Sequence, residues 1–156
     1  MNLAAHATKT NRRPQVGDLF ALKLTDGPFL FGRVVAVDAR PLGISGGVLI
    51  YVYRDTHREK IEIPATDPST LLIPPLITNT LPWSRGYFEH IEHIPLAAHE
   101  VRTTHAFWDC MRKVFRNEYG EVLSTDATDA GIWGLHSFKT IDDAVSQALG
   151  IPLSVD

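Results

Sequence analysis

Alternating apolar residues on both sides of a tight turn dominate residues 17–38 of the chain. The dipeptide Asp26-Gly27 separates two such runs, and an Asp-Gly pair between alternating runs is a strong signal for a β-hairpin. Apolar side chains fall on both faces of each run, a pattern that is typical of a sheet covered on both sides. The sequence therefore predicts that the fold opens with a long hairpin, around which the rest of the chain is arranged.

Three residues inside this hairpin need an explanation. Gly32 interrupts a strand, which favours the close passage of a large neighbour, and we expect this neighbour to be Phe20. Asp18 stands at the entrance, where we expect it to cap a turn through a backbone N–H group. Arg33 lies in an otherwise apolar strand. Because buried charges are normally paired, we expect an ion pair with Asp18 or Asp38; the alternative is that Arg33 faces a partner.

The remaining strands are predicted from short apolar or alternating runs. Residues 48–53, VLIYVY, are β-branched or aromatic almost throughout, and we expect them to pair with the second strand as a meander. Residues 54–64 are charged and form either a loop or an edge strand. Shorter strands are expected at residues 76–80, 87–94, 101–105 and 132–138.

Two stretches bear on helical structure in the middle of the chain. Asp67-Pro68 fits an N-cap followed by the first helical position, so a short helix is predicted at residues 69–73. Residues 107–114 (Phe107 to Val114) are ambiguous, because apolar residues recur there with a helical period while neighbouring positions also alternate as in a strand. In the second interpretation, residues 111–117 and 121–124 form a hairpin.

The clearest helix is predicted over residues 140–149. Thr140 and Asp143 have the spacing of a capping box, and Gly150 fits the left-handed position that ends many helices. The apolar residues of this segment form one continuous stripe at helical spacing: Ile141, Ala144, Val145, Ala148 and Leu149.

Together these patterns predict an α+β fold. Its main part is a mainly antiparallel, strongly curved β-sheet, which opens as a meander and is either SH3-like or a partial barrel. A short helix and the C-terminal amphipathic helix pack on this sheet. Residues 1–13 show no apolar period, so we expect a flexible N-terminal tail, followed by a single domain over residues 14–156, which is long enough to bury a core.

Composition narrows the class of protein. The chain has 156 residues, of which 44% are hydrophobic and 21% charged, as in a globular protein. Its net charge of −3 disfavours binding to a nucleic-acid backbone. Apolar runs are no longer than a strand, so no membrane span is predicted, and the N-terminus lacks the apolar core of a secretory signal. With a single cysteine, Cys110, the chain forms no internal disulfide, which fits a cytoplasmic location.

A group of histidines and glutamates is the main candidate for chemistry. Imidazole and carboxylate ligate zinc or iron, so a metal- or histidine-dependent hydrolase using the region between His90 and His105 has to be considered. The spacing argues against it, because His90 and His93 would converge only on a helix, whereas a strand turns them to opposite faces. The candidate ligands are Glu89, His90, Glu92, His93, His99 and His105.

Other catalytic arrangements lack support in the sequence. Cys110 paired with a histidine would make a nucleophile, but no glycine-rich turn accompanies it, and a lone cysteine is commonly a small buried hydrophobe. The sequence contains no phosphate loop, dinucleotide fingerprint or nucleophile elbow. We therefore predict no catalytic residues, no bound metal and no cofactor.

The opening hairpin resembles the start of the Imm26 family, immunity protein 26 of bacterial polymorphic toxin systems. The segments VLIYVY at residues 48–53 and PPLI at residues 74–77 also match, and residues 131–152 are similar to the end of some members. The resemblance implies a small cytoplasmic protein that binds and neutralises a cognate toxin encoded by a neighbouring gene, without being an enzyme. The hairpin residues that carry it are Gly17, Asp18, Phe20, Ala21, Asp26, Gly27, Phe31, Gly32, Arg33 and Val34.

Two kinds of surface residue are candidates for binding such a protein partner. Aromatic and arginine side chains are the usual anchors of interfaces, and acidic loop residues would steer the chain toward the basic cleft of a nuclease toxin. A weaker alternative is an SH3-like module that binds peptides. The candidate partner-binding residues are Tyr51, Tyr53, Arg54, Trp83, Asp126 and Asp129.

Overall fold

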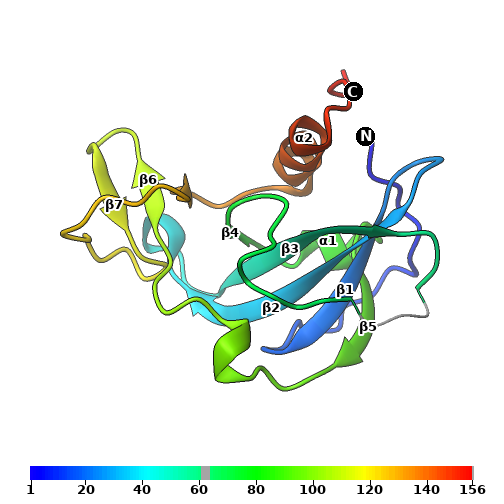
Figure 1. Ribbon diagram of the computed structural model, residues 1–156, viewed down its shortest axis with the longest axis horizontal. Helices are drawn as coiled ribbons and strands as arrows, with labels where there is room; N and C mark the ends of the chain where they lie inside the picture. The colour runs from blue at the N-terminus through cyan, green and yellow to red at the C-terminus, as the bar shows by residue number, and fades with distance from the viewer. Residues whose placement is uncertain (61–63, 156) are drawn as a thin grey trace.

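The computed structural model describes residues 1–60 and 64–155 and contains two β-sheets and two α-helices (Figure 1). The main sheet is antiparallel, with strand order β4-β3-β2-β1-β5. The predicted α+β fold with a mainly antiparallel sheet is confirmed, and the main sheet is open, so it does not form a closed barrel. The strands are β1 (Asp18–Lys23), β2 (Phe29–Ala39), β3 (Gly47–His57), β4 (Leu76–Thr78) and β5 (Glu89–His93).

The predicted opening hairpin is confirmed as β1 and β2. Asp26 has a φ of 56° at the turn, and Phe20 lies opposite Gly32 in the register of the two strands. A Cβ atom at position 32 would meet the ring of Phe20 and the carbonyl oxygen of Tyr51 below van der Waals distance. The glycine is therefore needed for the close passage of Phe20, as the sequence predicted.

Both faces of the main sheet are buried, and each face carries its own hydrophobic core. One face packs Phe20, Val34 and Trp83 against helix α2 (Phe138–Leu149) through Ile141 and Val145. The other face is built on a second set of side chains from the main sheet, together with Phe107 from a later strand. Its largest members are Phe31, Tyr51, Tyr53 and Phe107.

The N-terminal residues contribute to the first of these cores. Leu3 is 2% exposed and forms an isolated bridge with Leu24. Its backbone N–H group donates to Oδ1 of Asp142 on α2 at 2.5 Å, and the two ends of the chain lie near each other (Figure 1). The flexibility that we expect for residues 1–13 stays a prediction, but these contacts were not predicted from their composition.

Helix α2 begins earlier than its sequence pattern indicated. Its N-cap is Ser137, whose hydroxyl accepts from the N–H group of Thr140, so Thr140 is inside the helix rather than at its cap. The predicted C-cap is confirmed, since Gly150 has a φ of 71°. Ser137 lies about one helical turn before Thr140, and both residue types are common N-caps. The sequence pattern therefore did not distinguish between the two positions.

The short helix α1 lies at Leu81–Ser84 instead of residues 69–73. In that earlier segment Asp67 accepts a hydrogen bond from the backbone of Ser69, which makes a local turn and competes with a helix. Residues 101–105 form no strand. Residues 54–64 were expected to form a loop or an edge strand. Residues 54–57 continue strand β3, and residues 61–63 lie outside the described part of the chain.

A second sheet resolves the ambiguity around residue 110. Strands β6 (Phe107–Asp109) and β7 (Val114–Arg116) are antiparallel, and β8 (Gly131–Ile132) joins β6 in parallel, in the order β7-β6-β8. This sheet projects from one side of the main sheet, at the left of Figure 1. Two 3₁₀ turns, η1 (Pro41–Gly43) and η2 (Ala98–Glu100), complete the fold.

Candidate functional site

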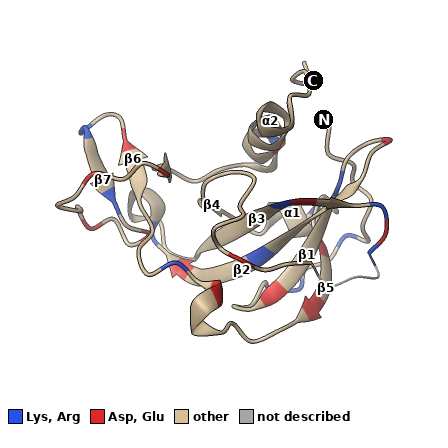
Figure 2. Cartoon of the chain, viewed as in Figure 1, with Lys and Arg blue, Asp and Glu red and all other residues tan. Residues whose placement is uncertain are grey.

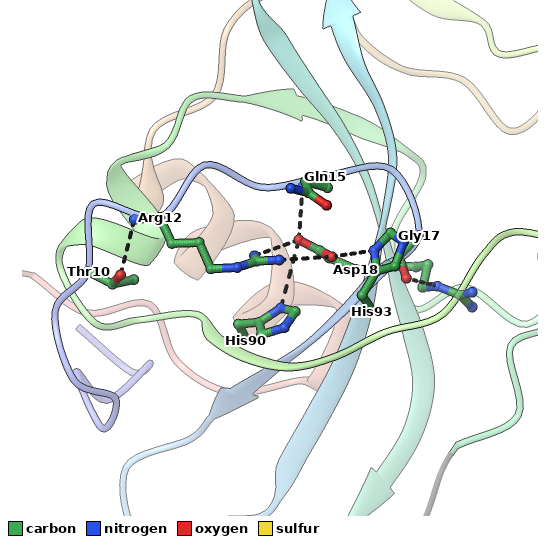
Figure 3. A network of polar contacts seen from close by, with 8 residues as sticks. Thr10, Arg12, Gln15, Gly17, Asp18, His90 and His93 are labelled. Carbon is green, nitrogen blue, oxygen red and sulfur yellow. Dashed lines mark hydrogen bonds and ion pairs between the residues drawn. The ribbon is translucent and has the colours of Figure 1, made fainter.

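A bulge in β5 brings His90 and His93 to the same carboxylate. In the pairing with β1, Leu19 lies opposite Glu92 and the next residue lies opposite His90, so Ile91 is skipped. An extra residue in a strand reverses the alternation of side chains. Placing the two imidazoles on opposite faces was therefore wrong, because both rings approach Asp18 (Figure 3).

Asp18 is buried and accepts hydrogen bonds from three directions. The guanidinium of Arg12 lies 2.7 Å from Oδ2, the N–H group of Gln15 2.8 Å from Oδ2, and Nδ1 of His93 2.9 Å from Oδ1 (Figure 3). Burial alone would raise the pKa of Asp18, but the bonds from Arg12, Gln15 and His93 together hold this pKa below its usual value. The predicted turn cap is thus confirmed through Gln15, and the same carboxylate also fixes Arg12 and β5.

The other predicted ligands do not join this group. His99 is exposed on η2, and His105 is engaged elsewhere. Within residues 1–60 and 64–155, no three His, Cys, Asp or Glu side chains are placed to hold a metal ion. Cys110 is exposed on a turn rather than buried. In the described part of the chain, no side-chain hydroxyl or thiol is hydrogen-bonded to His90 or His93, as the pairing of a side-chain nucleophile with its base requires.

Arg33 is fully buried and joins three segments of the second core. It donates to the carbonyl oxygens of Gly17 at 2.8 Å and Ile94 at 2.6 Å and to the carboxylate of Glu100 at 3.0 Å. Hydrogen bonds from Thr66 and from a backbone N–H group, together with the Arg33 charge, lower the pKa of Glu100 to about 2. The expectation of a buried ion pair is confirmed, but the partner is Glu100.

A chain of three side chains connects the main sheet to the segment that carries the second sheet. The hydroxyl of Tyr51 lies 2.6 Å from Nε2 of His105, and Nδ1 of His105 lies 2.5 Å from the carboxylate of Glu118. The Tyr51 oxygen also accepts from the N–H group of Arg102. Burial raises the pKa of Tyr51. Because the Tyr51 hydroxyl and both ring nitrogens of His105 are engaged within the protein, these contacts position the second sheet.

Half of the predicted partner-binding residues lie inside the protein. Tyr51, Tyr53 and Trp83 are 0%, 1% and 2% exposed, because the tyrosines belong to the core on one face of the main sheet and Trp83 belongs to the core on the other. Arg54, Asp126 and Asp129 are exposed. Of these, Arg54 donates to the carbonyl oxygen of Leu71 at 3.4 Å, and Asp129 pairs with Arg102 at 2.6 Å. Partner binding by the three exposed residues stays a prediction.

Exposed apolar side chains gather instead around the second sheet and η1. We call the depression between them the second-sheet hollow; its volume is about 530 Å³. Met111 is 86% exposed, Leu42 65% and Tyr119 46%. Sequence reasoning missed this surface because short strands with single apolar residues give no periodic signal. The hollow is lined by Arg40, Leu42, Gly43, Asp109, Met111, Arg112, Arg116, Tyr119, Gly120 and Trp133.

Basic side chains border this hollow. Figure 2 shows Lys and Arg residues on β7 and on the turn between β6 and β7. Arg116 is paired with Asp109 at 2.9 Å. Arg40 and Arg112 are exposed, and neither guanidinium contacts a carboxylate of the described residues. The hollow therefore combines an apolar floor with two arginines that are available to another molecule.

The comparisons with known proteins agree with the resemblance of the opening hairpin. In the described residues, no helix is both long and apolar enough to cross a membrane. No curated protein and no solved structure matches the chain. The model of the family described as immunity protein 26 matches residues 15–112, from the entrance of the hairpin to the turn after β6, which is more than half of the sequence. The chain belongs to the immunity protein 26 family, Imm26.

Proposed function

We propose that this protein is a non-enzymatic immunity protein that binds a cognate bacterial toxin domain and neutralises it. Membership of the immunity protein 26 family is the observation that carries the proposal. The partner is then a protein, encoded beside the gene for this chain, and binding requires no cofactor, nucleic acid or membrane. We expect the protein to bind the toxin in the cytoplasm of the producing cell, and the free thiol of Cys110 fits that reducing compartment.

The use of the buried polar groups supports binding rather than catalysis. Asp18, Arg33 and His105 are buried groups of the kinds found in active sites, and each is hydrogen-bonded to partners within the chain. A general acid or base needs a free position toward a substrate. These residues instead join separate segments, which leaves the outer surface as the part of the molecule that can act on another one.

Co-expression tests this proposal directly. The toxin domain encoded by the adjacent gene would be produced with and without this chain, and growth as well as complex formation in gel filtration would be measured. We expect restored growth and a stable complex that buries roughly 800 Å² on each partner. Toxin activity that persists in the presence of excess protein would contradict the proposal.

A small metal- or histidine-dependent hydrolase remains the competing function, because Asp18 and His93 form a carboxylate–imidazole pair in which His93 is 46% exposed. The two functions are separated by metal analysis of the purified protein and by turnover assays with ester and phosphodiester substrates. Stoichiometric metal, or turnover that disappears in His93→Ala, would favour the hydrolase.

A further inference from the structure

Leu42 is held in a conformation that leucine normally avoids. Its φ of 54° and ψ of 29° lie in the left-handed region, and 65% of the residue is exposed. The backbone is strained for a residue with a branched side chain, and the exposed leucine gains little from burial. Glycine would occupy this position without strain. Because neither packing nor backbone geometry favours a leucine here, the position points to a contact with another molecule.

The turn at the opposite border of the second-sheet hollow also contains a residue other than glycine with a left-handed backbone conformation. Lys113 has a φ of 57° and follows Met111 and Arg112 in the turn between β6 and β7. Among the described residues, three that are not glycine have a positive φ, and the third is Asp26 in the hairpin turn, where such a value is expected. Backbone strain is thus concentrated in two turns that border one hollow, and strain of this kind clusters at functional sites.

The charges of the hollow favour an acidic partner. Arg116 is neutralised by Asp109 and also donates to the carbonyl oxygen of Gly120 at 3.0 Å. Arg40 and Arg112 have no such pairing within the described residues, so the lining carries an excess of positive charge. A guanidinium presents a planar pair of donors that fits a carboxylate. An acidic segment would therefore find both arginines free to bind.

We propose that the second-sheet hollow is the surface that binds the toxin, and that it receives an acidic segment of the toxin with one apolar anchor side chain. This inference rests on the proposed function. The carboxylates pair with Arg40 and Arg112, and the apolar side chain packs between Leu42, Met111 and Trp133. A hollow of about 530 Å³ accommodates one large side chain with its neighbours, which is the arrangement of an interface hot spot.

Three variants test the inference against an inactivated form of the toxin domain encoded by the adjacent gene, with the dissociation constant measured by calorimetry. The double variant Arg40→Glu/Arg112→Glu should weaken binding by about a hundredfold or more. The matched control Arg13→Glu/Arg58→Glu, which reverses two exposed arginines outside the hollow, should stay within about threefold of the wild type.

The third variant separates recognition from folding. Leu42→Gly relieves the backbone strain, so its thermal unfolding midpoint should be equal to or higher than that of the wild type. Its affinity for the toxin should nevertheless fall by about tenfold, because the apolar contact is lost.

The wild type and the variants answer different questions. A wild type that does not bind the toxin overturns the proposed function itself. A wild type that binds, together with hollow variants that bind equally well, overturns the assignment of the surface and leaves the proposed function intact. Loss of affinity in the control pair as large as in the hollow pair would also overturn it, since binding would then follow net charge alone.

Discussion

Replacing Arg33 by methionine should bring the protein close to the limit of folding. The substitution keeps most of the aliphatic stem but removes the guanidinium, which is fully buried. The guanidinium donates to the carbonyl oxygens of Gly17 and Ile94 and to the carboxylate of Glu100 over distances of 2.6 to 3.0 Å. These bonds join the entrance of β1, the end of β5 and η2, so their loss affects three segments at once.

The loss of stability in Arg33→Met is set by the carboxylate and the two carbonyl oxygens that lose their donor. Removing one member of a buried ion pair costs about 3–5 kcal/mol, and a buried carbonyl without a donor costs about 1–3 kcal/mol. These two costs do not simply add, because Glu100 keeps its hydrogen bonds from Thr66 and Ala97 and its carboxylate can turn toward solvent. We therefore expect a loss of about 4 kcal/mol, which is a large part of the roughly 5–15 kcal/mol that holds a typical domain together.

The variant Glu100→Gln should be milder and should reveal the pH dependence of the pair. The hydrogen bonds from Thr66 and Ala97 and the charge of Arg33 hold the pKa of Glu100 at about 2, against an ordinary value of 4.5. A carboxylate with a lowered folded-state pKa stabilises the protein above pH 4.5 and loses this contribution as the pH falls toward 2. The difference corresponds to at most about 3 kcal/mol; screening by solvent reduces it to about 1–2 kcal/mol.

Urea unfolding monitored by tryptophan fluorescence measures these changes, since Trp83 is buried in the first core. The free energies of unfolding of the wild type, Arg33→Met, Glu100→Gln and the double variant form a thermodynamic cycle. At pH 6 we expect a coupling energy of about 2 kcal/mol, and the gap between wild type and Glu100→Gln should shrink on going to pH 3. A loss below about 1 kcal/mol for Arg33→Met, or a gap that widens at low pH, would show that the Arg33–Glu100 pair does not stabilise the fold in this way.

Four other substitutions probe the packing of the sheet and of α2, each through the free energy of unfolding. Gly32→Ala should cost about 2–4 kcal/mol, because the new methyl group collides with the ring of Phe20 and with the carbonyl oxygen of Tyr51; a neutral result would show that both groups can move aside. Val145→Asp should cost at least about 3 kcal/mol by burying an unpaired charge, whereas Ala148→Asp on the exposed side of the same helix should stay within about 1 kcal/mol; equal losses would contradict the position of α2. Ser137→Ala should cost about 1 kcal/mol by removing the N-cap, and an unchanged unfolding midpoint would place the helix start elsewhere.

The parts of the fold that the sequence predicted are those with strong local signals. The Asp-Gly turn fixes the β1–β2 hairpin, and the spacing of Ile141 and Val145 together with Gly150 identifies α2 and its end. These features depend on residues that are close in the sequence. A pattern of apolar positions over a few turns or a few strand residues is sufficient to recognise them.

The candidate sites were harder to predict because they depend on contacts between distant segments. The bulge at Ile91, which turns His90 and His93 toward Asp18, arises from the pairing of β5 with β1 and has no local signature. The burial of Tyr51 follows from the segment that carries His105 and Glu118, which closes over the sheet. The second sheet is completed only when β8 pairs with β6 across more than 20 residues of chain.

The boundaries of the family match do not coincide with the boundaries of the packed structure. Leu3 precedes residues 15–112, and Ile141 and Val145 follow them, yet all three belong to the core on one face of the main sheet. A truncated protein limited to the matched residues would lose α2 and Leu3 from that face and would deprive β6 of both neighbouring strands. Such a fragment should aggregate when expressed alone, so binding experiments on minimal fragments of this family need both flanking regions.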